Sequence, residues 1–177
     1  MTVPTFAAVD LGASSGRVLV GRLEGRRLST VETSRFVNEP VSVPTGTGTG
    51  TGTTLHWDVL SLWRGVLDGL RVAGREHGPV RSIGIDTWAV DHGLLDADGA
   101  LLGNPVHYRD ARTAGVPQRL FTALPEAELY AVTGVQHQPF NTLFQLGAAA
   151  GTAQLASAHR LLMIPDLLGH WLSGVEV

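Results

Sequence analysis

A short polar segment between two apolar runs constrains the fold of this chain more than any other feature. Residues 5–9 form an apolar run that ends at Asp10, and Leu-Gly-Ala-Ser-Ser-Gly-Arg follows as residues 11–17. Gly12 and Gly16 allow the backbone to turn tightly and to approach an anion. The N–H groups of such a turn, with two serine hydroxyls, favour a phosphate-binding strand–turn–strand. On spacing alone, an ordinary hairpin with a polar tip is an equal alternative.

Asp10 indicates metal chemistry at the same segment. A carboxylate does not bind phosphate directly, because both are anionic, but it can position Mg²⁺ beside phosphate oxygens. Arg17 adds a positive charge. All 13 basic residues of the chain are arginine, so a Walker-type phosphate loop, which requires lysine, is excluded.

Composition excludes several other classes of protein. The 177 residues are 44% hydrophobic and 16% charged, which is typical of a globular domain. A net charge of −3 gives no indication of a nucleic-acid or membrane partner. The absence of cysteine excludes disulfides and cysteine-based zinc sites. No signal peptide or membrane-spanning run is predicted, and we expect a cytoplasmic protein.

The order of apolar patterns predicts an α/β domain with a mixed sheet that begins with three antiparallel strands. Val175 and Val177 are expected to begin another strand, in a chain that continues. The Thr-Gly repeats of residues 44–54 predict a low-complexity mobile loop. Residues 81–86 and 90–95 are predicted to form a hairpin. The other predicted elements are strands at 5–9, 17–23 and 28–37, and helices at 58–74, 126–131, 143–156 and 166–172.

Three further segments carry polar groups that suit a ligand. Residues 83–91 place Asp86 and Thr87 at the end of a strand, and Trp88 offers either a stacking face for a sugar or a core side chain. Residues 108–112, Tyr-Arg-Asp-Ala-Arg, can hydrogen-bond a hydroxyl-rich ligand or simply start a helix. In the third segment, 139–146, Asn141 is a plausible helix N-cap. The seven histidines show no metal-ligand spacing.

Taken together, these segments resemble the N-terminal part of the FGGY carbohydrate kinases, and within them the rhamnulokinase branch. The resemblance spans nearly the whole chain, in the expected order. It rests on residues 9–17, Trp57-Asp58, 82–90, 108–112, 139–146 and 161–168.

The resemblance implies a ribonuclease-H-like, actin-type ATPase fold in which two lobes hold ATP between them. It implies transfer of the γ-phosphoryl group of ATP to the 1-hydroxyl of L-rhamnulose or a similar ketose, with Mg²⁺, in rhamnose catabolism. The partners implied are a small-molecule sugar and a second kinase lobe. By position, the resemblance implies that Asp10 helps to place the metal. It implies that the ATP phosphates are contacted by Ala13, Ser14, Ser15, Gly16 and Arg17. It implies that the substrate is contacted by Asp86, Thr87, Trp88, Ala89 and Arg109.

Two departures from the family pattern affect these expectations. The family usually has glycine at the position of Ala89, where the added methyl can crowd the sugar. The catalytic base of the family is an Asp in a His-Asp-Thr motif of the second lobe, and this motif does not occur in the sequence. No catalytic residue is therefore predicted in this chain. The alternative hypotheses are a degenerate or stand-alone binding module of the actin-type ATPase superfamily, or a scaffold-type ATPase of the same superfamily.

Overall fold

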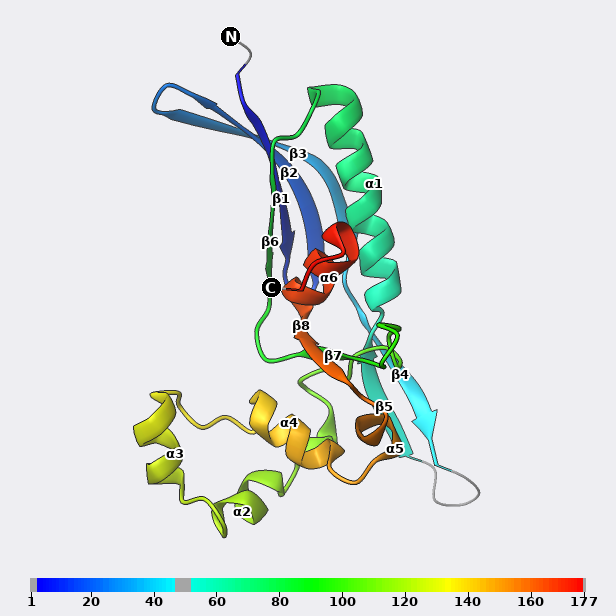
Figure 1. The fold of residues 1–177 in the computed structure, drawn as a ribbon, viewed down its shortest axis with the longest axis vertical. Coiled ribbons are helices and arrows are strands. Elements are labelled where there is room, and N and C mark those ends of the chain that lie inside the picture. The colour runs from blue at the N-terminus through cyan, green and yellow to red at the C-terminus, as the bar shows by residue number, and fades with distance from the viewer. Residues whose placement is uncertain (1–2, 47–51, 177) are drawn as a thin grey trace. The chain divides into compact units, whose positions relative to one another are not determined.

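The computed structural model describes residues 3–46 and 52–176 (Figure 1). Contacts divide them into two compact units. The first unit contains residues 3–40, 57–89 and 164–176, and the second contains residues 41–46, 52–56 and 90–163.

A four-stranded mixed sheet forms the first unit, in the order β3-β2-β1-β6. Strands β1 (Thr5–Leu11), β2 (Ser15–Glu24) and β3 (Arg27–Val37) are antiparallel to one another, as the sequence predicts. Strand β6 (Ile83–Thr87) lies parallel to β1. The α/β fold class with a mixed sheet is confirmed.

Helices α1 (Val59–His77) and α6 (Ile164–Ser173) pack on this sheet, and both confirm predicted helices. Asp58 caps α1, since its Oδ1 accepts a hydrogen bond from the backbone N–H of Ser61 at 3.1 Å. Every second residue of β1 is buried, which places its apolar face toward the helices. The core of the unit is built from Val9, Leu11, Val18, Val66, Ile164 and Leu168.

The second unit contains two strand pairs and a set of short helices (Figure 1). Strand β4 (Pro40–Thr45) pairs with β5 (Gly52–Trp57), and β7 (His92–Leu95) pairs with β8 (Arg160–Met163). The helical segments are η1 (Ala111–Thr113), α2 (Val116–Phe121), α3 (Glu126–Thr133), α4 (Thr142–Ala149) and α5 (Ala153–Ala156).

The predicted hairpin of residues 81–86 and 90–95 is wrong. Its two strands exist as β6 and β7, but β6 pairs with β1 and β7 pairs with β8. The predicted helix 143–156 is also wrong as one element. It is interrupted after Ala149, because Gly151 has φ +81° and Thr152 starts a new helix as its N-cap.

The boundaries of the predicted loop 44–54 are too wide. Residues 44–45 belong to β4 and residues 52–54 to β5, while residues 47–51 lie outside the described residues. Val175 is in no strand, and Val177 is not described. Strand β8 and helix α2 were not predicted. No helix in the described ranges is long and apolar enough to cross a membrane.

Candidate functional site

The predicted phosphate segment is a tight turn between β1 and β2. The backbone N–H of Gly12 donates to the carbonyl of Ser15 at 2.9 Å, and residues 12–14 are exposed. Neither predicted glycine has a positive φ. A Cβ on Gly16 would lie 2.3 Å from the Phe36 ring and 2.6 Å from Leu11. Gly16 is therefore required by packing beneath the turn, which corrects the prediction that it serves to bend the backbone.

Asn38 binds two carbonyls of this turn, although no sequence pattern marks it as a site residue. Its Nδ2 donates to the carbonyl of Gly12 at 2.7 Å, and its backbone N–H donates to the carbonyl of Ser14 at 3.1 Å. The residue is only 1% exposed. A lone asparagine after a strand belongs to no motif, so only the folded structure reveals its contacts.

A row of charged side chains crosses the face of the sheet away from the core. Asp10 lies opposite Arg17 on β2 and Asp86 on β6, and Arg17 lies opposite Arg35 on β3. Residues paired in register point to the same face of a sheet. Sequence positions 10, 17 and 86, all predicted to be functional, are thus brought side by side.

Asp10 and Arg17 form an ion pair within this row. The Nε of Arg17 donates to Oδ2 of Asp10 at 2.7 Å, and the two side chains are 43% and 38% exposed. Arg35 binds Glu32 through both its Nε and an Nη, at 3.1 and 2.6 Å. The hydrogen bond to Glu32 raises the pKa of Arg35, and the charge of Asp10 adds to the effect.

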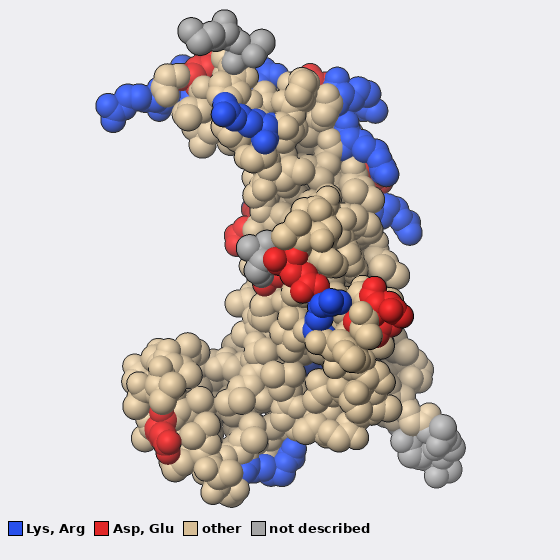
Figure 2. Space-filling model, viewed as in Figure 1, with Lys and Arg blue, Asp and Glu red and all other residues tan. Residues whose placement is uncertain are grey.

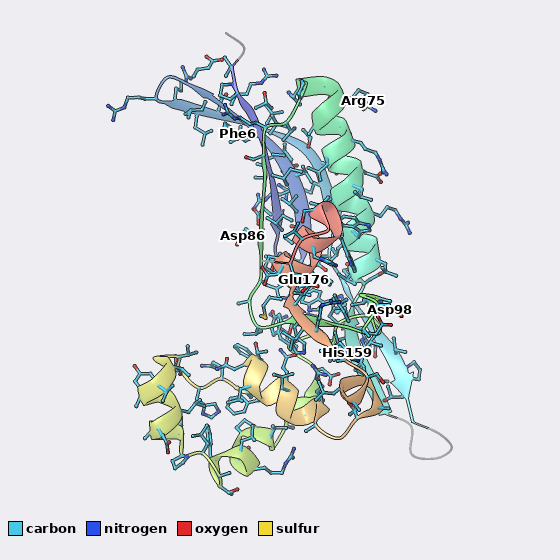
Figure 3. The ribbon with its side chains drawn as sticks, in the orientation of Figure 1. Phe6, Arg75, Asp86, Asp98, His159 and Glu176 are labelled. Atoms are coloured by element: carbon cyan, nitrogen blue, oxygen red, sulfur yellow. The ribbon has the colours of Figure 1, made fainter. Side chains whose placement is uncertain are left out.

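Further arginines of the first unit lie at the β2–β3 hairpin and on α1 (Figure 2). In Figure 3 the side chain of Asp86 projects from β6 on the side away from α6. Asp86 and Ala89 are exposed. The hydroxyl of Thr87 donates to the carbonyl of Trp88 at 2.8 Å.

Trp88 packs into the first unit. Its ring centroid lies 4.0 Å from that of the fully buried Trp57, and it contacts the core cluster. Of the two readings of Trp88, the structure favours the core side chain, with part of the residue still accessible.

Within the segment 108–112, only one arginine is exposed. Arg109 lies over the ring of Tyr108, with Cζ 5.2 Å from its centroid. Both carboxylate oxygens of Asp110 accept a hydrogen bond from a backbone N–H, that of Leu55 at 2.7 Å and that of Arg112 at 2.8 Å. Arg112 is half-buried, and its burial lowers its pKa. Arg109 therefore remains the predicted substrate residue of this segment, and Asp110 has a structural role.

A buried polar network underlies this segment in the second unit. The Nη2 of Arg112 donates to Oε1 of Gln145 at 2.8 Å, and Nε2 of Gln145 donates to Oδ1 of Asp91 at 2.7 Å. Asp91 is fully buried and Gln145 is 1% exposed. The second Asp91 oxygen accepts the backbone N–H of Tyr108 at 3.2 Å. The network fixes the chain just before Arg109.

Asn141 stands at the N-cap position of α4, as predicted, but its side chain makes no capping hydrogen bond. Its Nδ2 instead donates to the carbonyl of Gln136 at 3.1 Å.

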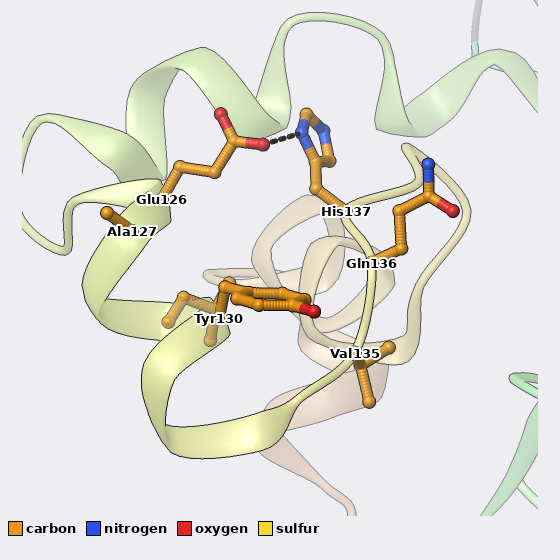
Figure 4. Close-up of a pocket in the computed structure, with 7 residues that line it drawn as sticks. Glu126, Ala127, Tyr130, Val135, Gln136 and His137 are labelled. Atoms are coloured by element: carbon orange, nitrogen blue, oxygen red, sulfur yellow. Dashed lines mark hydrogen bonds and ion pairs between the residues drawn. The ribbon is translucent and has the colours of Figure 1, made fainter.

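A separate cavity of about 480 Å³ opens beside α3 (Figure 4). Nδ1 of His137 and Oε1 of Glu126 lie 3.0 Å apart on its wall, and Tyr130 and Val135 complete much of the lining. No predicted site residue lines this cavity. In the part of the chain that the structure describes, no cluster of three or more metal-ligating side chains occurs.

The mixed sheet β3-β2-β1-β6, with α1 and α6 packed on it, makes the first unit an α/β domain. The chain belongs to the FGGY family of carbohydrate kinases, because the model of the family's N-terminal domain matches residues 5–177. This confirms the family that the sequence resembles.

Among its relatives, the chain is similar to proteins named rhamnulokinase. It is 39% identical to that of Bacteroides thetaiotaomicron over 174 residues, which are 97% of this chain and 34% of the relative. It is 40% identical to that of Bacillus subtilis over 175 residues, 97% of the chain and 34% of the relative. The chain thus spans about a third of the length of these relatives.

Solved structures show the same fold at low sequence identity. A gluconate kinase from Lactobacillus acidophilus matches with a TM-score of 0.78 and 15% identity, over 98% of this chain and 34% of that one. Glycerol kinase from Plasmodium falciparum, solved with ADP, matches with a TM-score of 0.66 and 14% identity, over 97% and 35%. These matches confirm the actin-like ATPase fold.

Proposed function

We propose that this chain is the N-terminal part of an ATP-dependent kinase that phosphorylates the 1-hydroxyl of L-rhamnulose or a similar ketose. The observation that carries the proposal is the identity of about 40% to rhamnulokinases over 96–99% of the chain. This is far above the 14–21% identity to the solved kinases that share the fold. The sequence likeness therefore favours the rhamnulokinase branch over other sugar kinases.

In this proposal, the β1–β2 turn binds the phosphates of ATP through residues 13–17. The exposure of Ala13 and Ser14 at the turn supports this role, since backbone N–H groups there are accessible to an anion. Arg17 provides the positive charge. Its ion pair with Asp10 is exposed and contributes at most about 1 kcal/mol, so Arg17 can exchange that partner for phosphate at little cost.

The residues present fit a hydrated Mg²⁺. Magnesium in nucleotide sites keeps several waters and is held through one or two carboxylates. Asp10 supplies one carboxylate, and Asp86 lies beside it in register on the neighbouring strand. Asp10 would hold the metal, whose charge would neutralise phosphate oxygens during transfer.

The proposed sugar contacts are Asp86, Thr87, Trp88, Ala89 and Arg109. The exposure of Asp86, Ala89 and Arg109 supports a role in contacting a ligand. Ala89 has no positive φ, so the residue that replaces the family's usual glycine is not strained there. Its methyl group is then a direct determinant of which ketose fits.

A chimera tests the proposed function. Residues 1–177 replace the matching N-terminal third of the Bacillus subtilis relative, and release of ADP is measured with L-rhamnulose and with other ketoses. L-rhamnulose-dependent ADP release, abolished by Asp10→Ala, supports the proposal. The unaltered relative is the positive control. A chimera that melts like the relative but prefers another sugar would contradict the L-rhamnulose assignment.

A further inference from the structure

Asn38 is a buried polar residue in an exposed stretch of the first unit. It is 1% exposed, whereas Val37 before it and Glu39 after it are exposed. Burial of an amide is unfavourable unless its polar atoms are hydrogen-bonded. The partners of Asn38 therefore indicate its role.

Two donors of Asn38 contact the β1–β2 turn. Its Nδ2 donates to the carbonyl of Gly12 at 2.7 Å, and its backbone N–H donates to the carbonyl of Ser14 at 3.1 Å. The carbonyl of Gly12 can only accept a hydrogen bond. The NH₂ group of the Asn38 side chain, and not its Oδ1, must therefore face it. Asn38 thus binds the carbonyls of two of the three residues between β1 and β2.

Because peptides are planar, the two hydrogen bonds to carbonyls also set the direction of the neighbouring N–H groups of the turn. In a planar trans peptide, the C=O of one residue and the N–H of the next point in opposite directions. Because Asn38 holds the carbonyls of Gly12 and Ser14 toward itself, the N–H groups of Ala13 and Ser15 are directed away from it. Outward N–H groups in a turn are the donors of an anion-binding nest.

The third polar atom argues against a role in stability alone. Oδ1 of Asn38 is buried and has no hydrogen-bond partner among the residues that the structure describes. Such an atom lowers stability by about 1–3 kcal/mol. An apolar side chain of the same size would avoid this loss but would leave the carbonyl of Gly12 without its donor. The amide is therefore better explained by the turn geometry that it imposes.

We propose that Asn38 is a positioning residue of the phosphate site, which orients the N–H groups of Ala13 and Ser15 toward the anion without touching it. This rests on the proposed function only in taking that anion to be a nucleotide phosphate.

The test compares Asn38→Leu with Thr33→Val in the 177-residue chain. Thr33 is a matched control, because its hydroxyl donates to the carbonyls of Val18 and Gly69 at 3.1 and 3.2 Å, away from the turn. Chemical shifts of the Ala13 and Ser15 amides are measured by NMR without nucleotide, and Mg·ADP is titrated into the Bacillus subtilis chimera that carries the same substitutions. We expect Asn38→Leu to shift the Ala13 amide, whose peptide carbonyl loses its donor, and to weaken Mg·ADP binding about tenfold. The Ser15 amide should shift less, because the backbone N–H of residue 38 still donates to the carbonyl of Ser14. Thr33→Val should leave both unchanged.

Asn38→Asp provides a rescue experiment. Its carboxylate would face the carbonyl of Gly12 with no proton to donate, so the turn amides should shift at neutral pH. On acidification the carboxyl gains a proton that it can donate, and the amide shifts should return toward those of the unaltered chain.

The two proposals fail in different ways. An unchanged Ala13 amide in Asn38→Leu, or an equal change in Thr33→Val, would overturn the positioning role. Normal turn amides in the 177-residue variants but no Mg·ADP binding by the chimera would count against nucleotide use, while the amide shifts would still decide the role of Asn38.

Discussion

Val90 is the most strained single residue in the described part of the chain. It is the one residue there, other than glycine, with a positive φ, at 71°, and its β-branched side chain makes that conformation unfavourable. Its carbonyl accepts hydrogen bonds from the Thr142 hydroxyl at 2.8 Å and from Nε2 of Gln145 at 3.2 Å. These bonds from α4 hold the strained backbone next to the buried carboxylate of Asp91.

Replacing Val90 by glycine should change the free energy of unfolding by less than about 1 kcal/mol. Relief of a strain of about 1–3 kcal/mol offsets the lost side-chain contacts and the entropy of glycine. Urea unfolding followed by circular dichroism measures the effect. In the control, Val20→Gly removes a buried side chain in an ordinary strand and should cost more than about 2 kcal/mol. Equal losses for the two variants would contradict the strain argument.

The same residues show how far a sequence predicts a site. Asp10, Arg17 and Asp86 were predicted because a charge at the end of an apolar strand is a local pattern, and the register then places them together. Asn38 and Gln145 belong to no local pattern. Their importance comes from carbonyls and carboxylates that are distant in sequence, and only the fold brings these within reach.

At the scale of elements, helix α1 approaches strand β2 closely at a glycine. A Cβ on Gly69 would lie 2.5 Å from the side chain of Val18, so the missing side chain lets the helix pack directly on the strand. Gly74, on the same helix, has nothing within 4 Å of an added Cβ. The two glycines therefore differ in packing while sharing the same secondary structure.

Alanine substitutions at these glycines should have opposite effects. Gly74→Ala should stabilise the chain by up to about 1 kcal/mol, because alanine favours helix. Gly69→Ala should destabilise it by about 1–3 kcal/mol, since the methyl forces α1 from the strand. All four tryptophans lie in the first unit, so tryptophan fluorescence during urea unfolding reports this change. Stabilisation by both substitutions would show that the helix moves away without cost.

Element types were predicted better than element partners. The amphipathic spacing that starts at Asp58 predicted α1, and alternation predicted the first three strands, because both are local properties. Strands β6 and β7 were predicted to pair with each other because they are neighbours in sequence. Each instead pairs with a distant strand, and no local pattern encodes that choice.

At the scale of the whole molecule, the second unit contains two histidines that should make stability depend on pH. Burial lowers the pKa of both His92 and His107 from the ordinary value of 6.5. The unfolded chain therefore takes up protons first as the pH falls. Stability should be level above about pH 6.5, should fall as the pH drops below it, and should level off again below the folded-state pKa values. Circular dichroism melts from pH 7.5 to 5 measure this dependence.

Variants separate these histidines from the rest of the chain. His92→Gln should reduce the slope of stability against pH between about pH 6.5 and 5, because one of the two groups no longer titrates. His107→Gln should reduce the slope in the same way, and the double variant should reduce it further. A slope that is unaffected by His92→Gln would exclude this residue as the source.

The isolated 177-residue chain should have no measurable sugar kinase activity. Phosphoryl transfer requires charged and positioning groups on both sides of the reacting phosphate. In the proposed function this chain would supply the β1–β2 turn, Asp10 and Arg17. The resemblance to the family implies that the catalytic base lies in a His-Asp-Thr motif, which the sequence does not contain. L-rhamnulose-dependent ADP production is the measurement, with Asp10→Ala as the background control. Production well above that background would show that this chain supplies its own base, and Asp86, beside Asp10 in register, would be the first residue to replace.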